Sequence, residues 1–283
     1  MISRSISAEV PHQPPAAVIV PPDEAVSPPP SKIPHYEIRV VRAYPHDPQA
    51  FTQGLSYAGG FLYESTGLYG SSSLRKVDLT TGRVIRIHRL PPEYFGEGIT
   101  FSRGRIIQLT WQERRGFVYD PETFRILNSF SFAGEGWGIA WDGRCLIISD
   151  GTARLRFLDP DTYREVKSIT VKDQGRSVSL INELEYVNGE VFANIWKSDL
   201  IARISPSTGE VVGWINLQGI YQGEAEDMLN GIAYDEQGGR LFITGKHWPY
   251  VYEVQISPPG DSSLKGNGCL GSFKMTSRAP SRW

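Results

Sequence analysis

Short apolar segments separated by turn residues recur along the chain between about residues 36 and 256. Each recurrence begins with a polar or aromatic residue, followed by a glycine and an aliphatic residue that opens a β-favouring run. The five steps are Gln53-Gly54-Leu55, Glu97-Gly98-Ile99, Trp137-Gly138-Ile139, Asn182-Glu183-Leu184 (with Glu183 in place of glycine) and Asn230-Gly231-Ile232. Counted at the middle residue, successive steps are 44, 40, 45 and 48 residues apart. A period of this length is typical of repeat proteins.

Three further strands are predicted after each of the first four steps. The second strand ends thirteen residues after the middle residue of the step in four units, and fifteen residues after it in the last. The third strand runs into a turn that begins with Asp or Ser, as at residues 78–82 and 205–209, which is favourable turn chemistry. The fourth strands are predicted over residues 84–90, 126–132, 165–171 and 211–217. Four short strands in a repeat of about 40–45 residues indicate the blade of a β-propeller.

The last unit has only three strands, the third over residues 250–256, whereas an unassigned strand over residues 36–44 precedes the first unit. If that strand completes the last blade, the ring closes and no sheet edge stays open. We therefore predict an all-β, five-bladed β-propeller over residues 35–257, with the ring closed by the N-terminal strand. Residues 1–34 and 258–283 are predicted to be a disordered Pro-rich leader and a disordered tail, because they contain too little apolar surface to offset chain entropy.

The bulk properties of the chain exclude several functions. A net charge of −2 without a basic cluster argues against binding to nucleic acid. No segment approaches the ~18 apolar residues of a membrane span. The longest apolar run of the leader, residues 16–20, is shorter than the ~7–15-residue core of a signal peptide, so the sequence leaves the compartment unknown. The histidines lack the spacing of zinc ligands, which argues against a zinc site. We also expect the protein to be a monomer.

Equivalent positions of the five units should surround the central channel, because the first strand of each propeller blade lines it. The ten positions that precede the first strands or end the second strands are Gln53, Gly67, Glu97, Trp111, Trp137, Gly151, Asn182, Trp196, Asn230 and Lys246. With Phe51, we call these the hub residues. Capping of a loop or packing between blades would explain any single hub residue. Neither explains why a carboxylate, a cation and three amides occur at the same level of the channel. Such a set between tryptophans is typical of a site for a small molecule or a chain terminus.

Glu97 is the only carboxylate among the hub residues. Burial against tryptophans should raise the pKa of its carboxyl, and a nearby Lys246 should oppose that shift. A carboxyl tuned in this way can accept and donate a proton near neutral pH.

Two other functions stay open on these residues alone. One is a non-catalytic propeller that binds a peptide end or a partner at the same hub. The other is a calcium-dependent lactone or ester hydrolase, which would need several carboxylates and a histidine at the hub.

Several longer motifs are similar to those of a known family. They are Phe51-Thr-Gln-Gly-Leu55, Glu64-Ser-Thr-Gly-Leu-Tyr-Gly70, Tyr94-Phe-Gly-Glu-Gly98, Asn182-Glu-Leu-Glu-Tyr186, Ala193-Asn-Ile-Trp196, Leu229-Asn-Gly-Ile-Ala233 and Thr244-Gly-Lys-His-Trp-Pro249. Over residues 36–256 the chain resembles the plant-type glutaminyl cyclases, typified by the papaya latex enzyme. The resemblance implies a five-bladed propeller that converts the N-terminal glutamine of peptides or proteins to pyroglutamate with loss of ammonia. It also implies a periplasmic or secreted location.

The resemblance also assigns roles to the hub residues. The proton-transfer glutamate of the family falls on Glu97, and Lys246 and Asn182 are expected to hydrogen-bond the substrate carbonyl oxygen as it becomes negative. The remaining pocket positions fall on Phe51, Gln53, Trp111, Trp137 and Trp196, with Asn230 as an addition. Unlike the zinc-dependent animal-type enzymes, the family implies no required cofactor. A structural Ca²⁺ in the central channel is compatible with the sequence but not indicated by it.

Overall fold

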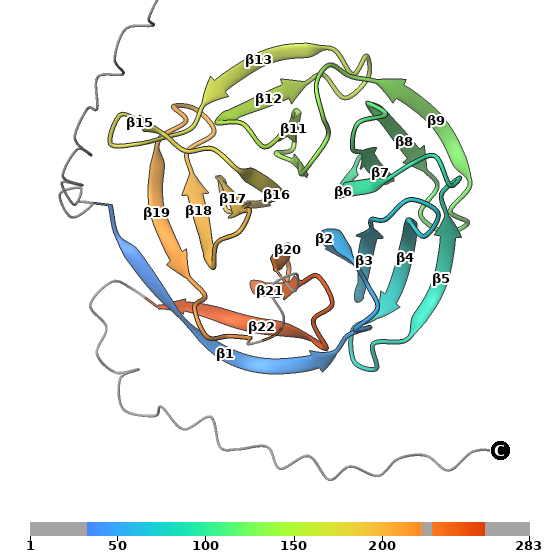
Figure 1. The fold of residues 1–283 in the computed structure, drawn as a ribbon, viewed down its shortest axis with the longest axis horizontal. Helices are drawn as coiled ribbons and strands as arrows, with labels where there is room; N and C mark the ends of the chain where they lie inside the picture. The colour runs from blue at the N-terminus through green and yellow to red at the C-terminus, as the bar shows by residue number, and fades with distance from the viewer. Residues whose placement is uncertain (1–32, 222, 224–227, 258–283) are drawn as a thin grey trace, which may run out of the picture. The chain divides into compact units, whose positions relative to one another are not determined.

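The computed structural model describes residues 33–221, 223 and 228–257, and these form an all-β structure. The strands form five blades of four antiparallel strands each, and the blades are arranged around a central axis (Figure 1). The first blade consists of β2 (Thr52–Ala58), β3 (Phe61–Thr66), β4 (Ser73–Asp78) and β5 (Val84–Arg89). The second blade consists of β6 (Gly96–Ser102), β7 (Arg105–Thr110), β8 (Arg115–Tyr119) and β9 (Ile126–Ser131). The third blade consists of β10 (Ile139–Trp141), β11 (Leu146–Ile148), β12 (Arg154–Leu158) and β13 (Glu165–Thr170). No helix able to span a membrane occurs among the described residues.

The last two blades are joined into one sheet. Their strands are β16 (Ile181–Val187), β17 (Glu190–Ile195), β18 (Leu200–Ile204) and β19 (Val211–Asn216), then β20 (Leu229–Asp235), β21 (Arg240–Gly245), β22 (Tyr250–Ser257) and β1 (His35–Pro45). Strand β1 pairs antiparallel with β22 and, through His35 and Tyr36, parallel with β19, so that both blades share an eight-stranded sheet. The predicted five-bladed propeller and its closure by the N-terminal strand are thus confirmed. The parallel pairing with β19 was not predicted.

The strand bounds agree with the sequence expectation to within one or two residues in most blades. A short hairpin of β14 (Lys172–Asp173) and β15 (Arg176–Ser177), between the third and fourth blades, was not predicted. The leader over residues 1–34 and the tail over residues 258–283 lie outside the described residues, apart from Ile33 and Pro34. Their predicted disorder therefore stays a prediction.

The turns between third and fourth strands have the predicted Asp chemistry. Asp78, Asp120 and Asp159 each accept a hydrogen bond of 2.8 Å from the backbone N–H of the threonine three residues later. Each carboxylate also accepts the hydroxyl of the same threonine. These aspartates stabilise the turns, as expected of Asx turns.

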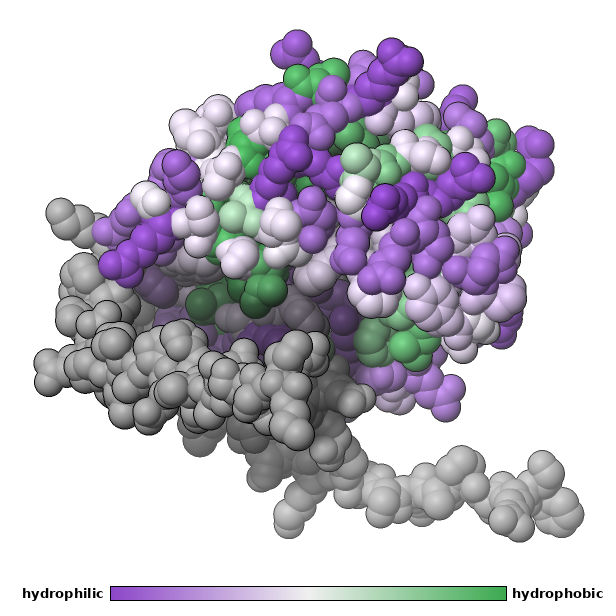
Figure 2. All heavy atoms as spheres, turned by 45° about the horizontal axis from the view of Figure 1, so that its top comes forward, coloured by the Kyte–Doolittle hydropathy of each residue, from purple (hydrophilic) through white to green (hydrophobic). Residues whose placement is uncertain are grey.

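Five hydrophobic clusters form the core, and each lies between two neighbouring blades. Leu55 and Leu62 of the first blade, for example, pack with Ala233 and Phe242 of the last. The fourth strands form the rim and expose single aliphatic side chains such as Val166. On the face that Figure 2 presents, hydrophobic residues are scattered among hydrophilic ones.

Four glycines allow the first strands to approach one another closely at the channel. We call Gly54, Gly98, Gly138 and Gly231 the glycine collar. A Cβ atom on Gly54 would lie 2.6 Å from the backbone nitrogen of Ile99, and one on Gly98 would lie 2.7 Å from that of Ile139. Both distances are shorter than a van der Waals contact. Only glycine, which has no Cβ atom, therefore fits between strands at this spacing.

Glu183 takes the fifth position of the glycine collar. Its side chain crosses the channel, where Oε1 accepts the backbone N–H of Leu55 at 3.3 Å and Oε2 accepts that of Ile232 at 2.9 Å. Those N–H groups belong to the first and last blades, so one buried carboxyl links three blades at the axis. Burial raises the pKa of Glu183 well above its usual value, against the effect of these two hydrogen bonds.

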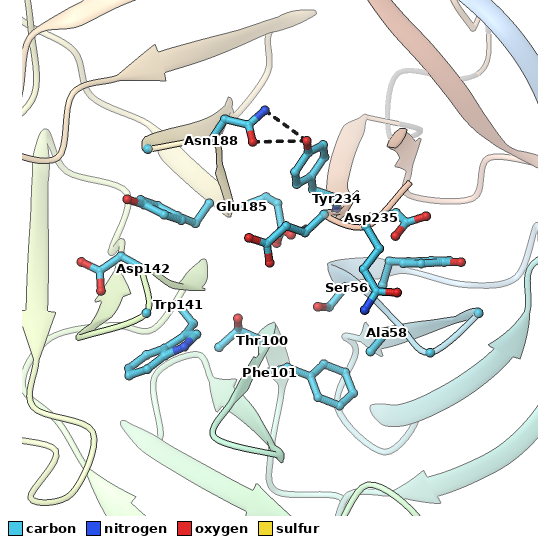
Figure 3. A pocket seen from close by; sticks show the side chains of 18 residues that line it. Ser56, Ala58, Thr100, Phe101, Trp141, Asp142, Glu185, Asn188, Tyr234 and Asp235 are labelled. Atoms are coloured by element: carbon cyan, nitrogen blue, oxygen red, sulfur yellow. Dashed lines mark hydrogen bonds between the residues drawn. The ribbon is translucent and has the colours of Figure 1, made fainter. Parts of the chain in front are cut away.

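A cavity of about 710 Å³ opens at the end of the channel where first and second strands meet in hairpin turns. Figure 3 shows Glu185 of β16 pointing into it, between Tyr234 and Trp141. Burial raises the pKa of Glu185 to about 8, and the N–H of Tyr234 opposes this shift. None of the hub residues lines this cavity, because they occupy the opposite ends of the first strands.

The glycine collar predicts a stability effect that local conformation cannot explain. A Gly54→Ala substitution should lower the free energy of unfolding by about 2–3 kcal/mol, because the new methyl group overlaps the backbone of the next blade. Gly104→Ala is the control: its φ of 72° is unfavourable for alanine, but no atom lies within 4 Å of the new Cβ. That variant should lose about 1 kcal/mol. Equal losses in urea titrations would contradict the close approach of the strands.

Candidate active site

The hub residues come from the channel ends of four first strands and from the loops beside them. Gln53 lies on β2, Glu97 on β6, Asn182 on β16 and Asn230 on β20, and all four side chains are buried. The remaining side chains that the sequence predicts for the site follow or precede strands: Phe51 before β2, Trp111 after β7, Trp137 before β10, Trp196 after β17 and Lys246 after β21. Residues from all five blades thus meet at one end of the channel.

A chain of hydrogen bonds fixes the Glu97 carboxyl. Asn230 Nδ2 donates to Gln53 Oε1 at 3.0 Å, and Gln53 Nε2 donates to Glu97 Oε1 at 2.8 Å. Asn230 Nδ2 also donates to the carbonyl of Thr52 at 3.0 Å, which holds its own amide in place. No other hydrogen bond from the described residues reaches the Glu97 carboxyl, which leaves Oε2 available to a substrate.

The electrostatic environment raises the pKa of Glu97 and lowers the pKa of Lys246, so that the two values lie closer together than in free side chains. Burial raises the pKa of Glu97 well above its usual value, while Lys246 and the hydrogen bond from Gln53 oppose this shift. Burial also lowers the pKa of Lys246, against the attraction of Glu97. The Lys246 ammonium lies 4.5 Å from the centre of the Phe51 ring, a favourable cation–π contact. Glu97 therefore binds a proton more readily than an ordinary glutamate does, which favours a role as both acceptor and donor of a proton.

Aromatic rings surround these polar groups. Trp137 and Trp196 meet edge to face with ring centres 5.6 Å apart, and Phe95 contacts Trp111 at 5.5 Å and Phe51 at 6.2 Å. The three tryptophans are only partly buried, and none of these five rings belongs to a core cluster between the blades. Packing of the propeller therefore does not account for them, whereas a binding site does.

The two glycines among the hub residues make room for these rings. A Cβ atom on Gly67 would overlap the ring of Phe95. One on Gly151, whose φ is 78°, would lie 2.6 Å from the indole of Trp137. Asn182 is buried on the same ring, where its backbone carbonyl accepts the Ser149 hydroxyl at 2.6 Å. No hydrogen bond of its side chain to another described residue is present, so its amide stays available to a ligand.

Three residues at this end of the channel were not predicted from the sequence. Phe95 packs against the aromatic rings, Glu135 accepts the indole N–H groups of two tryptophans, and the ring of His247 lies 5.5 Å from that of Phe51. His247 thus contacts Phe51, although no histidine is among the hub residues. Phe95 and Glu135 stand two residues before Glu97 and Trp137, as Phe51 does before Gln53. The repeat itself would have identified them.

The possible metal ligands of the described residues are dispersed. No group of three or more His, Cys, Asp or Glu side chains lies close enough there to hold a metal ion. Glu183 and Glu185 are neighbours on β16, but the oxygens of Glu183 already accept two backbone N–H groups.

Comparisons with known proteins agree with this arrangement. The family described as Glutamine cyclotransferase matches residues 15–256. The glutaminyl-peptide cyclotransferase of Arabidopsis thaliana is 48% identical over 239 residues, which cover 82% of this chain and 74% of that protein. The crystal structure of Myxococcus xanthus glutaminyl cyclase is 36% identical and superposes with a TM-score of 0.76, over 80% of this chain and 99% of the other. The chain belongs to the glutamine cyclotransferase family.

Proposed function

We propose that the chain is a glutaminyl-peptide cyclotransferase, which converts an N-terminal glutamine to pyroglutamate with release of ammonia, and that Glu97 transfers the proton. Relatives with that name and the family match support the activity. The observation that carries the role of Glu97 is its burial at the channel end, where Gln53 holds Oε1 and no hydrogen bond from another described residue reaches Oε2. Substrates are peptides or proteins that begin with glutamine.

The reaction needs one proton to leave one nitrogen and to reach another. The neutral α-amine attacks the γ-carbonyl carbon of the same residue, so that a C–N bond forms and the carbonyl oxygen becomes negative. Glu97 takes the proton that the attacking nitrogen loses and gives it to the departing amide nitrogen. The C–N bond to that nitrogen then breaks, the carbonyl re-forms and ammonia leaves. A single carboxyl with a raised pKa can perform both transfers.

Other hub residues would stabilise the reacting geometry. We assign Lys246 and Asn182 as donors to the carbonyl oxygen while it carries charge, because both are buried at the same depth as Glu97. The tryptophan rings would hold the flexible glutamine side chain in a folded shape, which lowers the entropy cost of closing a five-membered ring. The Asn230–Gln53 chain would keep the Glu97 carboxyl from turning away between substrates.

This route supplies proton transfer and charge stabilisation from side chains alone, so we propose that no cofactor is required. A monomeric state and the absence of nucleic-acid or membrane partners stay predictions.

Loss of the Glu97 carboxylate should abolish turnover without abolishing binding. A Glu97→Gln variant is expected to release ammonia from a Gln-initiated dipeptide at least roughly 100-fold more slowly, because its amide cannot shuttle a proton. Its affinity for the dipeptide, measured by calorimetry, should change little. Glu165→Gln, on the outer strand β13, is the matched control and should behave as the wild type. Wild-type ammonia release by folded Glu97→Gln would contradict the role of Glu97.

Removal of metal ions should leave the reaction rate unchanged. After dialysis against a chelator, kcat/KM for a Gln-initiated dipeptide is expected to stay within about twofold of the untreated value, since the proposed steps use only side-chain groups. The assay is repeated with added Zn²⁺ and Ca²⁺. A large loss that either ion restores would show that the reaction depends on a metal.

A further inference from the structure

The segment that leads into β10 carries a carboxylate between two indoles. Glu135 Oε2 accepts Trp111 Nε1–H at 2.7 Å and Trp137 Nε1–H at 3.0 Å. Its other oxygen accepts Gln112 Nε2 at 3.2 Å. Trp111 follows the second strand of one blade and Trp137 precedes the first strand of the next. One oxygen atom therefore fixes the relative orientation of two rings from neighbouring blades.

The backbone that carries Glu135 is itself held in place. The N–H of Gly136 donates to the carbonyl of Trp111 at 3.1 Å, and a Cβ atom on Gly136 would lie 2.6 Å from the carbonyl oxygen of Thr110. Arg156, buried on β12, donates to the carbonyl of Glu135 at 3.3 Å and also to the carbonyl of Ala133. The position of the carboxylate is therefore set before any ligand arrives.

Glu135 is anionic in this setting. Burial opposes its ionisation, but the hydrogen bonds from Trp137, Trp111 and Gln112 outweigh that effect and lower the pKa of its carboxyl. A hydrogen bond to a charged acceptor is stronger than one between neutral groups. Both indoles are thus held more firmly than a neutral acceptor would hold them.

Packing of the fold does not require this arrangement. Both tryptophans are partly exposed and lie outside the core clusters, so water could satisfy their N–H groups if Glu135 were absent. The rings they present belong to the aromatic surroundings of Glu97 described above. A rigid orientation of these rings is useful only to something that binds between them.

We propose that Glu135 is a positioning residue for the cyclisation: through the two indole N–H groups it holds Trp111 and Trp137 at the angle that folds an N-terminal glutamine for attack. This inference rests on the proposed function of the same site. Glu135 itself makes no bond to the reacting atoms. Its effect on the rate passes through the two rings, where a displacement of about 1 Å can cost about 100-fold.

The charge of Glu135 has a second, separable effect. Glu135 and Glu113 both add to the raised pKa of Glu97, because a nearby negative charge disfavours a further one. Glu97 must be ionised to accept the proton, so activity falls as pH drops through its pKa. Removal of either charge lowers that pKa and should move the acid limb of the pH–rate profile to lower pH.

Three variants separate the indole effect from the charge effect. In Glu135→Ala, kcat for a Gln-initiated dipeptide is expected to fall about 10- to 100-fold. Glu135→Gln should recover part of this loss, because its amide oxygen can still accept the indole N–H groups. Glu113→Gln removes a charge of the same sign but contacts neither indole, since its carboxylate accepts Tyr69 Oη and the Phe95 N–H. Glu113→Gln and Glu135→Gln should shift the acid limb in the same direction.

A double-mutant cycle tests whether Glu135 acts through the indoles. On a Trp111→Phe, Trp137→Phe background, which lacks both N–H groups, the further change Glu135→Ala should lower the residual kcat less than twofold. An equal loss on both backgrounds, or wild-type kcat in Glu135→Ala, would overturn the proposal. If Glu135→Ala does not fold, Glu135→Gln takes its place in the cycle: its smaller loss of kcat should likewise disappear on the Trp111→Phe, Trp137→Phe background, and an equal loss on both backgrounds would overturn the proposal. The outcome of this cycle does not depend on the Glu97→Gln experiment. Wild-type activity of Glu97→Gln would overturn the proposed function, whereas the cycle tests only the role of Glu135.

Discussion

The close approach of the five first strands is the constraint on which the rest of the structure depends. At Gly54, Gly98 and Gly138 a side chain would overlap the backbone of the next blade, and at Gly231 the backbone has a φ of 140°, which favours glycine. This spacing brings the residues immediately before the glycine collar to one ring, although they are 40 or more residues apart in the sequence. Gln53, Glu97 and Asn230 can therefore hydrogen-bond in a chain across three blades. The collar that closes the fold thus also assembles the site.

Three glutamates of the channel, of which Glu97 and Glu183 are buried and Glu185 is partly exposed, show how the environment assigns different roles to one residue type. Glu183 has both oxygens occupied by backbone N–H groups, so it serves as a link between blades. Glu185 has a pKa raised to about 8 and faces the cavity at the other end. Glu97 alone of the three combines burial with a neighbouring ammonium, that of Lys246, and with an oxygen, Oε2, that accepts no hydrogen bond from another described residue. Only this combination favours proton transfer to a bound nitrogen.

The repeat made most of the fold predictable from sequence, because each blade carries its own strand and turn signals. The parallel pairing of His35 and Tyr36 with β19 escaped prediction, since a two-residue contact between distant strands has no local signal. Eight of the nine predicted site side chains, among them Glu97 and Asn230, are linked by contacts among the described residues, whereas Asn182 has only its position on the ring. The place of Glu135, two residues before Trp137, follows from the repeat, but its hydrogen bonds to two indoles do not, because no sequence pattern reveals the direction of those side chains.

The central claim is that one carboxyl with a raised pKa both accepts and returns the proton. The most direct test is the titration of the Glu97 carboxyl itself, by infrared difference spectra of wild type against Glu97→Gln across pH. We expect the protonated carboxyl band to disappear well above the range of an ordinary glutamate, about pH 4.3. That transition should coincide with the acid limb of kcat/KM, which reports the free enzyme. Titration of Glu97 in the ordinary range, or at a pH unrelated to that limb, would contradict the account.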